Sequence, residues 1–139
     1  MDTSSLIKLY LDEEHSALVH SWVDSAEILC TSRVAYPEAM AALARRRRVG
    51  DLDDDSFRVI RDAVSGEWAG FSTIDLNEQR AGELAVRLGL RGFDAVHLAA
   101  AHEVAEVEGT SVFFSSFDKQ LNRIARADGL AVLDAESDL

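Results

Sequence analysis

Cysteine and proline are almost absent from this sequence of 139 residues, which holds one of each and 8 glycines. Cys30 has no partner for an intrachain disulfide, and because it lies in an apolar stretch we expect it to pack as a small core residue. No Pro-rich or Gly-rich linker and no internal repeat marks a boundary. We therefore expect residues 1–139 to form a single domain, a length that suits one compact core.

Long apolar runs are also lacking. No stretch of the sequence is long enough to span a bilayer, and the N-terminus carries neither a basic leader nor the long hydrophobic region of a signal peptide. Together with the lone cysteine, these absences predict a protein of the reducing cytoplasm with no membrane partner.

Basic residues are scarce, since 14 Lys and Arg stand against 25 acidic residues and give a net charge of −11. Such a charge repels polyanions at long range, so nucleic-acid binding would require local basic patches. A basic run at the end of a helix is also favoured by the helix dipole and is often only solvated. The candidates are the run Arg45, Arg46, Arg47 and Arg48 and the helical set Lys119, Arg123 and Arg126.

Helical periodicity alternates with short apolar runs along the chain, a pattern typical of an α/β domain. Pro37 falls near the start of one predicted helix, so either its first turn is distorted or regular helix begins near Pro37. From Ala95 to Ala101 every residue except His97 is apolar, which predicts a buried helix. Strands are predicted at 27–31, 71–76, 111–115 and 131–133, and helices at 18–25, 33–48, 57–68, 78–88, 95–101 and 118–128.

Acidic residues precede or begin several of these helices. Asp2 lies at the start of the chain, and Glu38, Asp94 and Asp118 each lie near the N-terminal end of a predicted helix. In a parallel sheet covered by helices on both faces, such positions gather along one edge. Helix dipoles favour ionised carboxylates there, and Mg²⁺ or Mn²⁺ would relieve their mutual repulsion. A site of this kind can hydrolyse a phosphodiester bond.

Plainer interpretations of these residues remain open. Asp2 suits a solvated acid at a frayed helix start, and Asp94 suits a helix N-cap. The acidic run 51–55 is interpreted as capping because Ser56 and Asp62 stand where a calcium loop needs Gly and Glu. His97 and His102 are assigned no catalytic role, because an isolated imidazole is more often packed or hydrogen-bonded than metal-bound.

Four stretches in a fixed order resemble the PIN domains of the VapC type, the ribonuclease half of VapBC toxin–antitoxin pairs. The resemblance implies a PIN-like three-layer α/β/α sandwich with a central parallel sheet. It also implies that Asp2, Glu38, Asp94 and Asp118 are catalytic, metal-binding carboxylates, and that Thr3, Ser4 and Ser116 are hydroxyls that hold water or carboxylates beside them. The four stretches are MDTSSLIKLY, TSRVAYPEAMAALARRRR, GFDAVHLAAA and FFSSFDKQLNRIA.

The same resemblance implies an activity and partners. The expected reaction is hydrolysis of RNA by a water bound to Mg²⁺ or Mn²⁺, in the toxin component of a type II toxin–antitoxin system. The expected partners are a second copy of the chain and a small VapB-type antitoxin, whose C-terminal segment commonly sends an arginine into the acidic pocket. A guanidinium pairs well with carboxylates there and would displace the metal.

The sequence departs from the family pattern in two places. Family members usually carry a short apolar strand, the central strand of the sheet, before the first aspartate, whereas only Met1 precedes Asp2 here. We expect either a start codon assigned too late or a first strand that is nearly absent, and the cost of unpaired backbone in mid-sheet favours the first. Pro37 directly before Glu38 is the second departure, and it bears on how Glu38 is aimed.

Two other function classes stay open. A PIN-like domain that has lost its first strand or its metal would act as an RNA-binding or partner-binding module. A phosphatase or phosphoacceptor domain of another α/β family also uses an N-terminal aspartate. The hydrolase version needs a second aspartate two residues later, where this chain has Ser4, which disfavours it.

Overall fold

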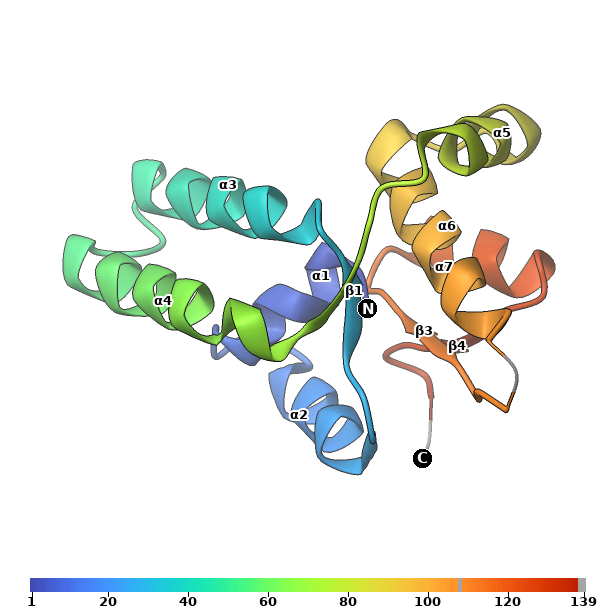
Figure 1. The fold of residues 1–139 in the computed structure, drawn as a ribbon. Helices are drawn as coiled ribbons and strands as arrows, with labels where there is room; N and C mark the ends of the chain where they lie inside the picture. The colour runs from blue at the N-terminus through green and yellow to red at the C-terminus, as the bar shows by residue number, and fades with distance from the viewer. Residues whose placement is uncertain (108, 138–139) are drawn as a thin grey trace.

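The computed structural model describes residues 1–107 and 109–137 and shows a mixed fold of helices and short parallel strands (Figure 1). The described elements are α1 (Thr3–Leu6), η1 (Ile7–Leu9), α2 (Ser16–Ser25), β1 (Cys30–Ser32), α3 (Ala35–Arg48), α4 (Asp54–Glu67), η2 (Trp68–Gly70), β2 (Ser72–Ile74), α5 (Glu78–Leu88), α6 (Gly92–Ala105), β3 (Phe113–Ser115), α7 (Lys119–Ala127) and β4 (Ala131–Leu133). None of the helices in this described part combines the length and apolarity needed to cross a bilayer.

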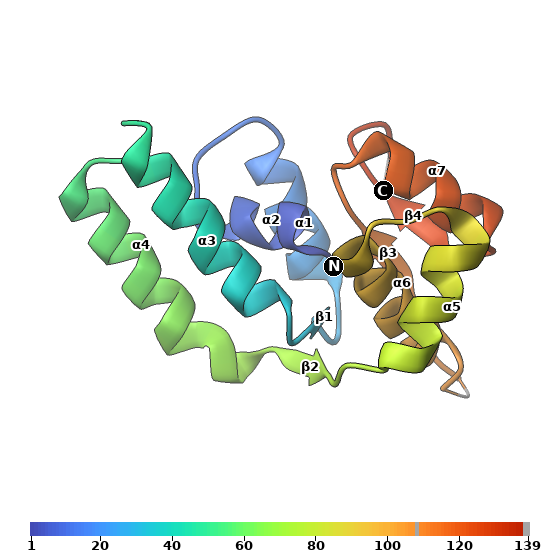
Figure 2. The ribbon, with the colours of Figure 1, turned by 90° about the horizontal axis from the view of Figure 1, so that it is seen from above.

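The first two residues of the chain lie between two strand pairs. β1 pairs with β2 and β3 pairs with β4, each pair parallel, and in the described residues they form two separate two-stranded sheets. The Met1 ammonium donates to the Cys30 carbonyl at 2.8 Å, and the Asp2 N–H donates to the Ser115 carbonyl at 2.9 Å. Figure 2 shows the N-terminus between the two pairs. These bonds fix the position of Asp2 between β1 and β3.

Two hydrophobic clusters lie on either side of this N-terminal segment. One joins α1, α3 and α4 through buried residues such as Leu6, Leu43 and Val64. The other joins α5, α6, α7, β3 and β4, with Leu98 and Phe114 among its most buried side chains. In Figure 1, α3 and α4 stand on one side of the N-terminus and α5 to α7 on the other. The helix starts that carry the candidate acids therefore face the region between the clusters.

Pro37 does not disturb the helix that carries Glu38. α3 begins at Ala35, so Pro37 lies in its first turn, where a missing N–H costs no helical hydrogen bond. The Glu38 N–H already bonds to the Val34 carbonyl at 3.2 Å, as in a regular helix. Glu38 is therefore presented from a regular first turn.

Two sequence-based interpretations are wrong in detail. The strand predicted at 27–31 lies at Cys30–Ser32, and Ile28 is 68% exposed, because local apolarity was a poor guide to burial in so short a strand. The N-cap interpretation of Asp94 also fails. α6 begins at Gly92 with Arg91 as its N-cap, so Asp94 is the third residue of the helix and its carboxylate is not needed as a cap.

Candidate active site

Asp2 is a buried anchor of the site. It is the N-cap of α1 and only 6% exposed, so the interpretation as a solvated acid at a frayed start is wrong. Its Oδ1 accepts hydrogen bonds from the Ser4 hydroxyl at 2.7 Å and from the Ser5 N–H at 3.1 Å. Both contacts use the same oxygen, and Oδ2 takes no part in them.

Glu38 is held in the same way from the first turn of α3. Its Oε1 accepts a hydrogen bond from the Thr3 hydroxyl at 2.7 Å and lies 2.7 Å from Nε2 of His97. Burial raises the pKa of Glu38, but the hydrogen bonds from His97 and Thr3 and the nearby positive charge together outweigh it and hold this pKa below its ordinary value. The carboxylate is therefore ionised at neutral pH.

His97 is one of two residues of this site, with Arg91, that the sequence analysis missed. Its side chain is 4% exposed, and its buried Nδ1 has no hydrogen-bond partner among the described residues. We therefore assign its proton to Nε2, where it is donated to Glu38. Its spacing could have revealed it, because a residue three positions after Asp94 lies on the same face of a helix.

Asp94 and Asp118 converge on one arginine. Asp94 lies in the first turn of α6, and Asp118 is the N-cap of α7, where its Oδ1 accepts hydrogen bonds from the backbone N–H groups of Gln120 at 2.8 Å and Leu121 at 3.0 Å. Nε of Arg91 donates to Oδ2 of Asp94 at 2.8 Å, and its Nη2 donates to Oδ2 of Asp118 at 3.3 Å.

The environment of Arg91 links it to a third acid. The hydrogen bond to Asp94 and the negative charge of Asp94, followed by the charges of Asp118 and Glu38, raise the pKa of Arg91 above its ordinary value. Glu38 thus lies close enough to Arg91 to act on it electrostatically. Arg91 thus bonds Asp94 and Asp118 directly and interacts with Glu38 through its charge.

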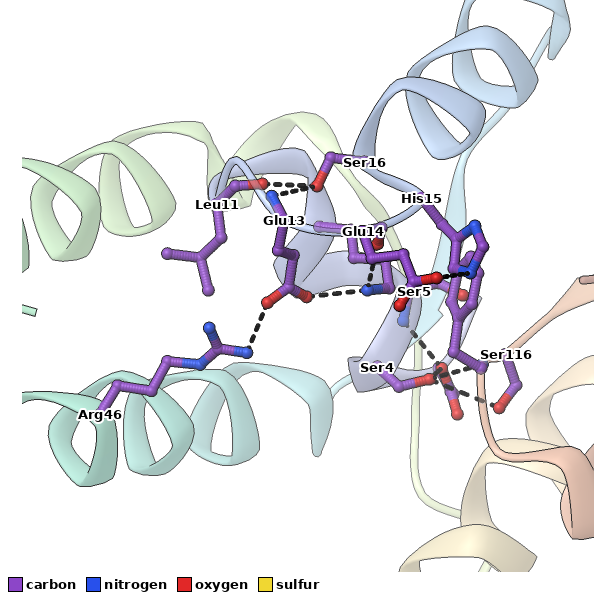
Figure 3. A network of polar contacts seen from close by, with 12 residues as sticks. Ser4, Ser5, Leu11, Glu13, Glu14, His15, Ser16, Arg46 and Ser116 are labelled. Atoms are coloured by element: carbon purple, nitrogen blue, oxygen red, sulfur yellow. Dashed lines mark hydrogen bonds and ion pairs between the residues drawn. The ribbon is translucent and has the colours of Figure 1, made fainter. Parts of the chain in front are cut away.

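Two serines join Asp2 to the loop that carries Asp118. The Ser4 hydroxyl donates to Asp2 and accepts a hydrogen bond from the Phe117 N–H at 2.8 Å. The Ser116 hydroxyl accepts one from the Asp118 N–H at 3.0 Å, and the two hydroxyls lie 3.5 Å apart. Figure 3 shows Ser4 and Ser116 directed toward one another. These hydroxyls link the first and the last of the four candidate acids, Asp2 and Asp118.

The residues suit a hard divalent cation by the chemistry of their donor atoms, although their side chains are not grouped around one point. In residues 1–107 and 109–137, no three His, Cys, Asp or Glu side chains are grouped closely enough to hold a metal ion. The donors that gather here are nonetheless carboxylate oxygens, the ligands that Mg²⁺ and Mn²⁺ prefer. Arg91 also shows that Asp94 and Asp118 can bind a single positive charge together.

The seven candidate RNA-binding residues fall into two groups. In the first group the guanidinium is already paired with a carboxylate, in each case at 2.6 Å: Arg46 with Glu13 (Figure 3), Arg47 with Asp54 and Arg126 with Asp134. The second group is exposed and forms no ion pair within the described part of the chain, and its members are Arg45, Arg48, Lys119 and Arg123. Lys119 directly follows Asp118, whereas Arg45 lies about 10 Å along α3 from Glu38.

Comparison with known proteins identifies the family to which the fold belongs. A PIN domain family model matches residues 1–127. The chain belongs to the PIN domain family. This PIN domain is 35% identical over 140 residues to Ribonuclease VapC45 and to Ribonuclease VapC49 of Mycobacterium tuberculosis, an overlap of 99% of the chain and 95% of each relative. It is 30% identical over 128 residues to Ribonuclease VapC47 of the same species, covering 87% of the chain and 85% of that relative. The predicted α/β PIN fold is confirmed.

Proposed function

We propose that this PIN domain is a metal-dependent endoribonuclease that hydrolyses RNA phosphodiesters, as the toxin of a type II toxin–antitoxin pair. The observation that carries the proposal is that Asp94 and Asp118 share the Arg91 guanidinium, while Ser4 and Ser116 link Asp2 to the loop of Asp118. Glu38, in the first turn of α3, acts on the same guanidinium through its charge. Similarity over nearly the whole chain to proteins named as VapC ribonucleases supports the same reaction.

In this proposal the carboxylates Asp2, Glu38, Asp94 and Asp118 hold one or two Mg²⁺ or Mn²⁺ ions. When bound, such an ion lowers the pKa of a water molecule and stabilises negative charge on the phosphate. The protein positions the ligands beforehand. In Asp2, Glu38 and Asp118, one oxygen is fixed by two hydrogen-bond donors and the other is not needed for those bonds. No covalent link between enzyme and RNA is required.

RNA would approach this site against a net charge of −11, so exposed basic side chains near it carry weight. Lys119 and Arg123 lie on the helix that starts at Asp118, and we propose that they contact the RNA backbone. Arg45 and Arg48 lie near the far end of α3 and would contact a more distant part of the RNA.

We further propose a VapB-type antitoxin and a second copy of the chain as partners, with residues 1–139 acting as one domain. Two carboxylates that already bind the Arg91 guanidinium, Asp94 and Asp118, have the chemistry to accept an arginine from an antitoxin. The family match over residues 1–127 supports a single domain.

The proposal is tested with purified protein, structured RNA and Mg²⁺ or Mn²⁺, comparing the wild type with Asp94→Asn. We expect chelation by EDTA to stop cleavage and Asp94→Asn to slow it by more than about a hundredfold, because a metal ligand matters at least as much as the groups that orient it. Asp62→Asn serves as the matched control, since Asp62 is an exposed acid of α4 paired with Arg61.

The outcomes separate the candidate functions. Equal cleavage by the wild type and Asp94→Asn would rule out the assigned site. Binding of RNA without cleavage by either protein would instead favour the PIN-like binding module.

A further inference from the structure

Arg91 occupies an unusual place for a basic side chain. It is the N-cap residue of α6, its side chain is 78% exposed, and its guanidinium contacts Oδ2 of both Asp94 and Asp118. These are the two acids that the site presents from α6 and α7. A positive charge that belongs to the chain itself therefore lies where the proposed function requires a metal ion.

The Asp118 carboxylate and the backbone of Asp94 are held by contacts that do not involve Arg91. Asp118 is fixed by the N–H groups of Gln120 and Leu121 on its other oxygen, Oδ1. Asp94 lies on a helix whose next residue, Ala95, is 1% exposed and whose Leu98 is fully buried. Loss of the guanidinium would therefore remove a charge from the site, while the Asp118 carboxylate and the helix that carries Asp94 stay in place.

Competition with a metal ion follows from electrostatics. An exposed arginine gains only a small net free energy from its carboxylate pairs, because water solvates the guanidinium well and its flexible side chain must be ordered. A divalent cation gains more from the same oxygens. The guanidinium cannot keep both bonds while a metal ion uses Oδ2 of Asp94 and of Asp118, and its charge repels the ion.

We propose that Arg91 is an internal counter-ion that occupies the cation site and must be displaced before a divalent metal ion binds. The inference rests on the metal site of the proposed function. Arg91 thereby lowers the metal affinity of the site and keeps the acids from repelling one another when no metal is bound. The displaced side chain, exposed at the start of α6, leaves the carboxylates accessible.

The test measures Mn²⁺ affinity directly, without RNA, by titration calorimetry and by electron paramagnetic resonance of free Mn²⁺. The variants are Arg91→Gln and Arg91→Lys, with Arg87→Gln as the matched control. Arg87 pairs with Asp128 at 2.6 Å, so its substitution removes one charge from an ion pair that involves none of the four acids. Thermal unfolding of each variant shows that the fold is retained.

We expect Arg91→Gln to bind Mn²⁺ roughly two- to fivefold more tightly than the wild type, the range that corresponds to an exposed ion pair. Arg91→Lys should fall between them, and Arg87→Gln should match the wild type. Equal or weaker binding by Arg91→Gln would overturn the inference. If the wild type and Arg91→Gln bind Mn²⁺ equally tightly but Asp94→Asn does not bind it, the inference fails and the proposed metal site stands. If no variant binds Mn²⁺, the proposed function fails as well.

Discussion

At the scale of single residues, the site is organised by which oxygen of each carboxylate the protein has already bound. Thr3 and His97 both donate to Oε1 of Glu38, and Ser4 and the Ser5 N–H both bond Oδ1 of Asp2. Two donors on one oxygen fix the plane of a carboxylate, which a single donor does not. The second oxygen can then face a cation at little further cost in side-chain entropy.

His97 is expected to act as a positioning residue for Glu38. We predict that His97→Ala lowers both Mn²⁺ affinity and cleavage by about 10–100-fold, the usual effect of removing a group that orients a metal ligand. His97→Gln should recover part of the loss, because its amide can still donate to Glu38. The control is His102→Ala on the same helix, since His102 pairs with Asp128 instead.

Metal affinity separates this role from a general structural one. If His97→Ala binds Mn²⁺ as tightly as the wild type and only its thermal stability falls, His97 contributes to the stability of the core and does not position Glu38 for metal binding.

At the scale of elements, Asp128 ties three helices together. It caps the C-terminus of α7, accepts two hydrogen bonds from Arg87 of α5, at 2.6 and 3.1 Å, and lies 2.8 Å from Nε2 of His102 on α6. The bonds from Arg87, and then the one from His102, outweigh the effect of burial and hold the pKa of Asp128 below its ordinary value. The ionised carboxylate is thus a structural link behind the site.

We predict that Asp128→Asn lowers the melting temperature at pH 7 by about 3–6 °C. Because the folded pKa is depressed, this stabilisation is fully present above the unfolded pKa, near 3.8, and is lost as the pH falls through the folded value. Thermal melts from pH 7 down to pH 2 should show the difference shrink below about pH 4. Glu106→Gln breaks a more exposed pair with Arg80 and should cost less. If the difference in melting temperature between the wild type and Asp128→Asn stayed constant with pH, the stabilising role of the ionised Asp128 carboxylate would be contradicted.

The segment between β1 and β3 makes a second prediction at this scale. The Met1 ammonium is buried, and burial lowers its pKa because the charged form is poorly solvated there. An added stretch of four β-branched residues before Met1 would replace this charge with a peptide bond and could pair with both strands. We expect the melting temperature to rise by at least about 3 °C. A Gly-Ser extension of equal length is the control, and equal melting temperatures for the two extensions would contradict the prediction.

At the scale of the whole molecule, the net charge of −11 makes the location of each basic side chain important for RNA binding. The double variant Lys119→Glu/Arg123→Glu places its charge reversal on the helix that begins at Asp118. Arg45→Glu/Arg48→Glu makes the same change of charge on α3, beyond the turns that carry Glu38. We predict that KM for RNA rises roughly tenfold in the first variant and less in the second, with a shallower salt dependence in the first. If both double variants kept the KM of the wild type, the four basic side chains would be only solvated and would not contact RNA.

The sequence predicts the elements whose local signals agree. α5 is predicted at its observed bounds, because an amphipathic pattern ends at Gly89, which adopts the left-handed conformation that favours glycine there. The order of strands and helices places the four candidate acids near helix starts, whereas their role as metal ligands comes from the resemblance to the PIN family and stays a prediction.

The contacts between distant elements could not be predicted. The bond of His97 to Glu38 and the place of Arg91 on Asp118 depend on how α6 meets α3 and α7, which no local pattern encodes. The predicted bounds of β1 were wrong for a related reason. The position of a three-residue strand depends on the strand it pairs with more than on its own composition.

The central claim, that four carboxylates from four helix starts form one cation site, is tested most directly by a crystal structure of the protein with Mn²⁺, using anomalous scattering to locate the metal. The account predicts an anomalous peak about 2.1 Å from oxygens of Asp94 and Asp118, with Arg91 moved away and Asp2 and Glu38 beside the ion or its waters. A peak only at the acidic run of residues 51–55, or Arg91 still bound to both aspartates at saturating Mn²⁺, would contradict it.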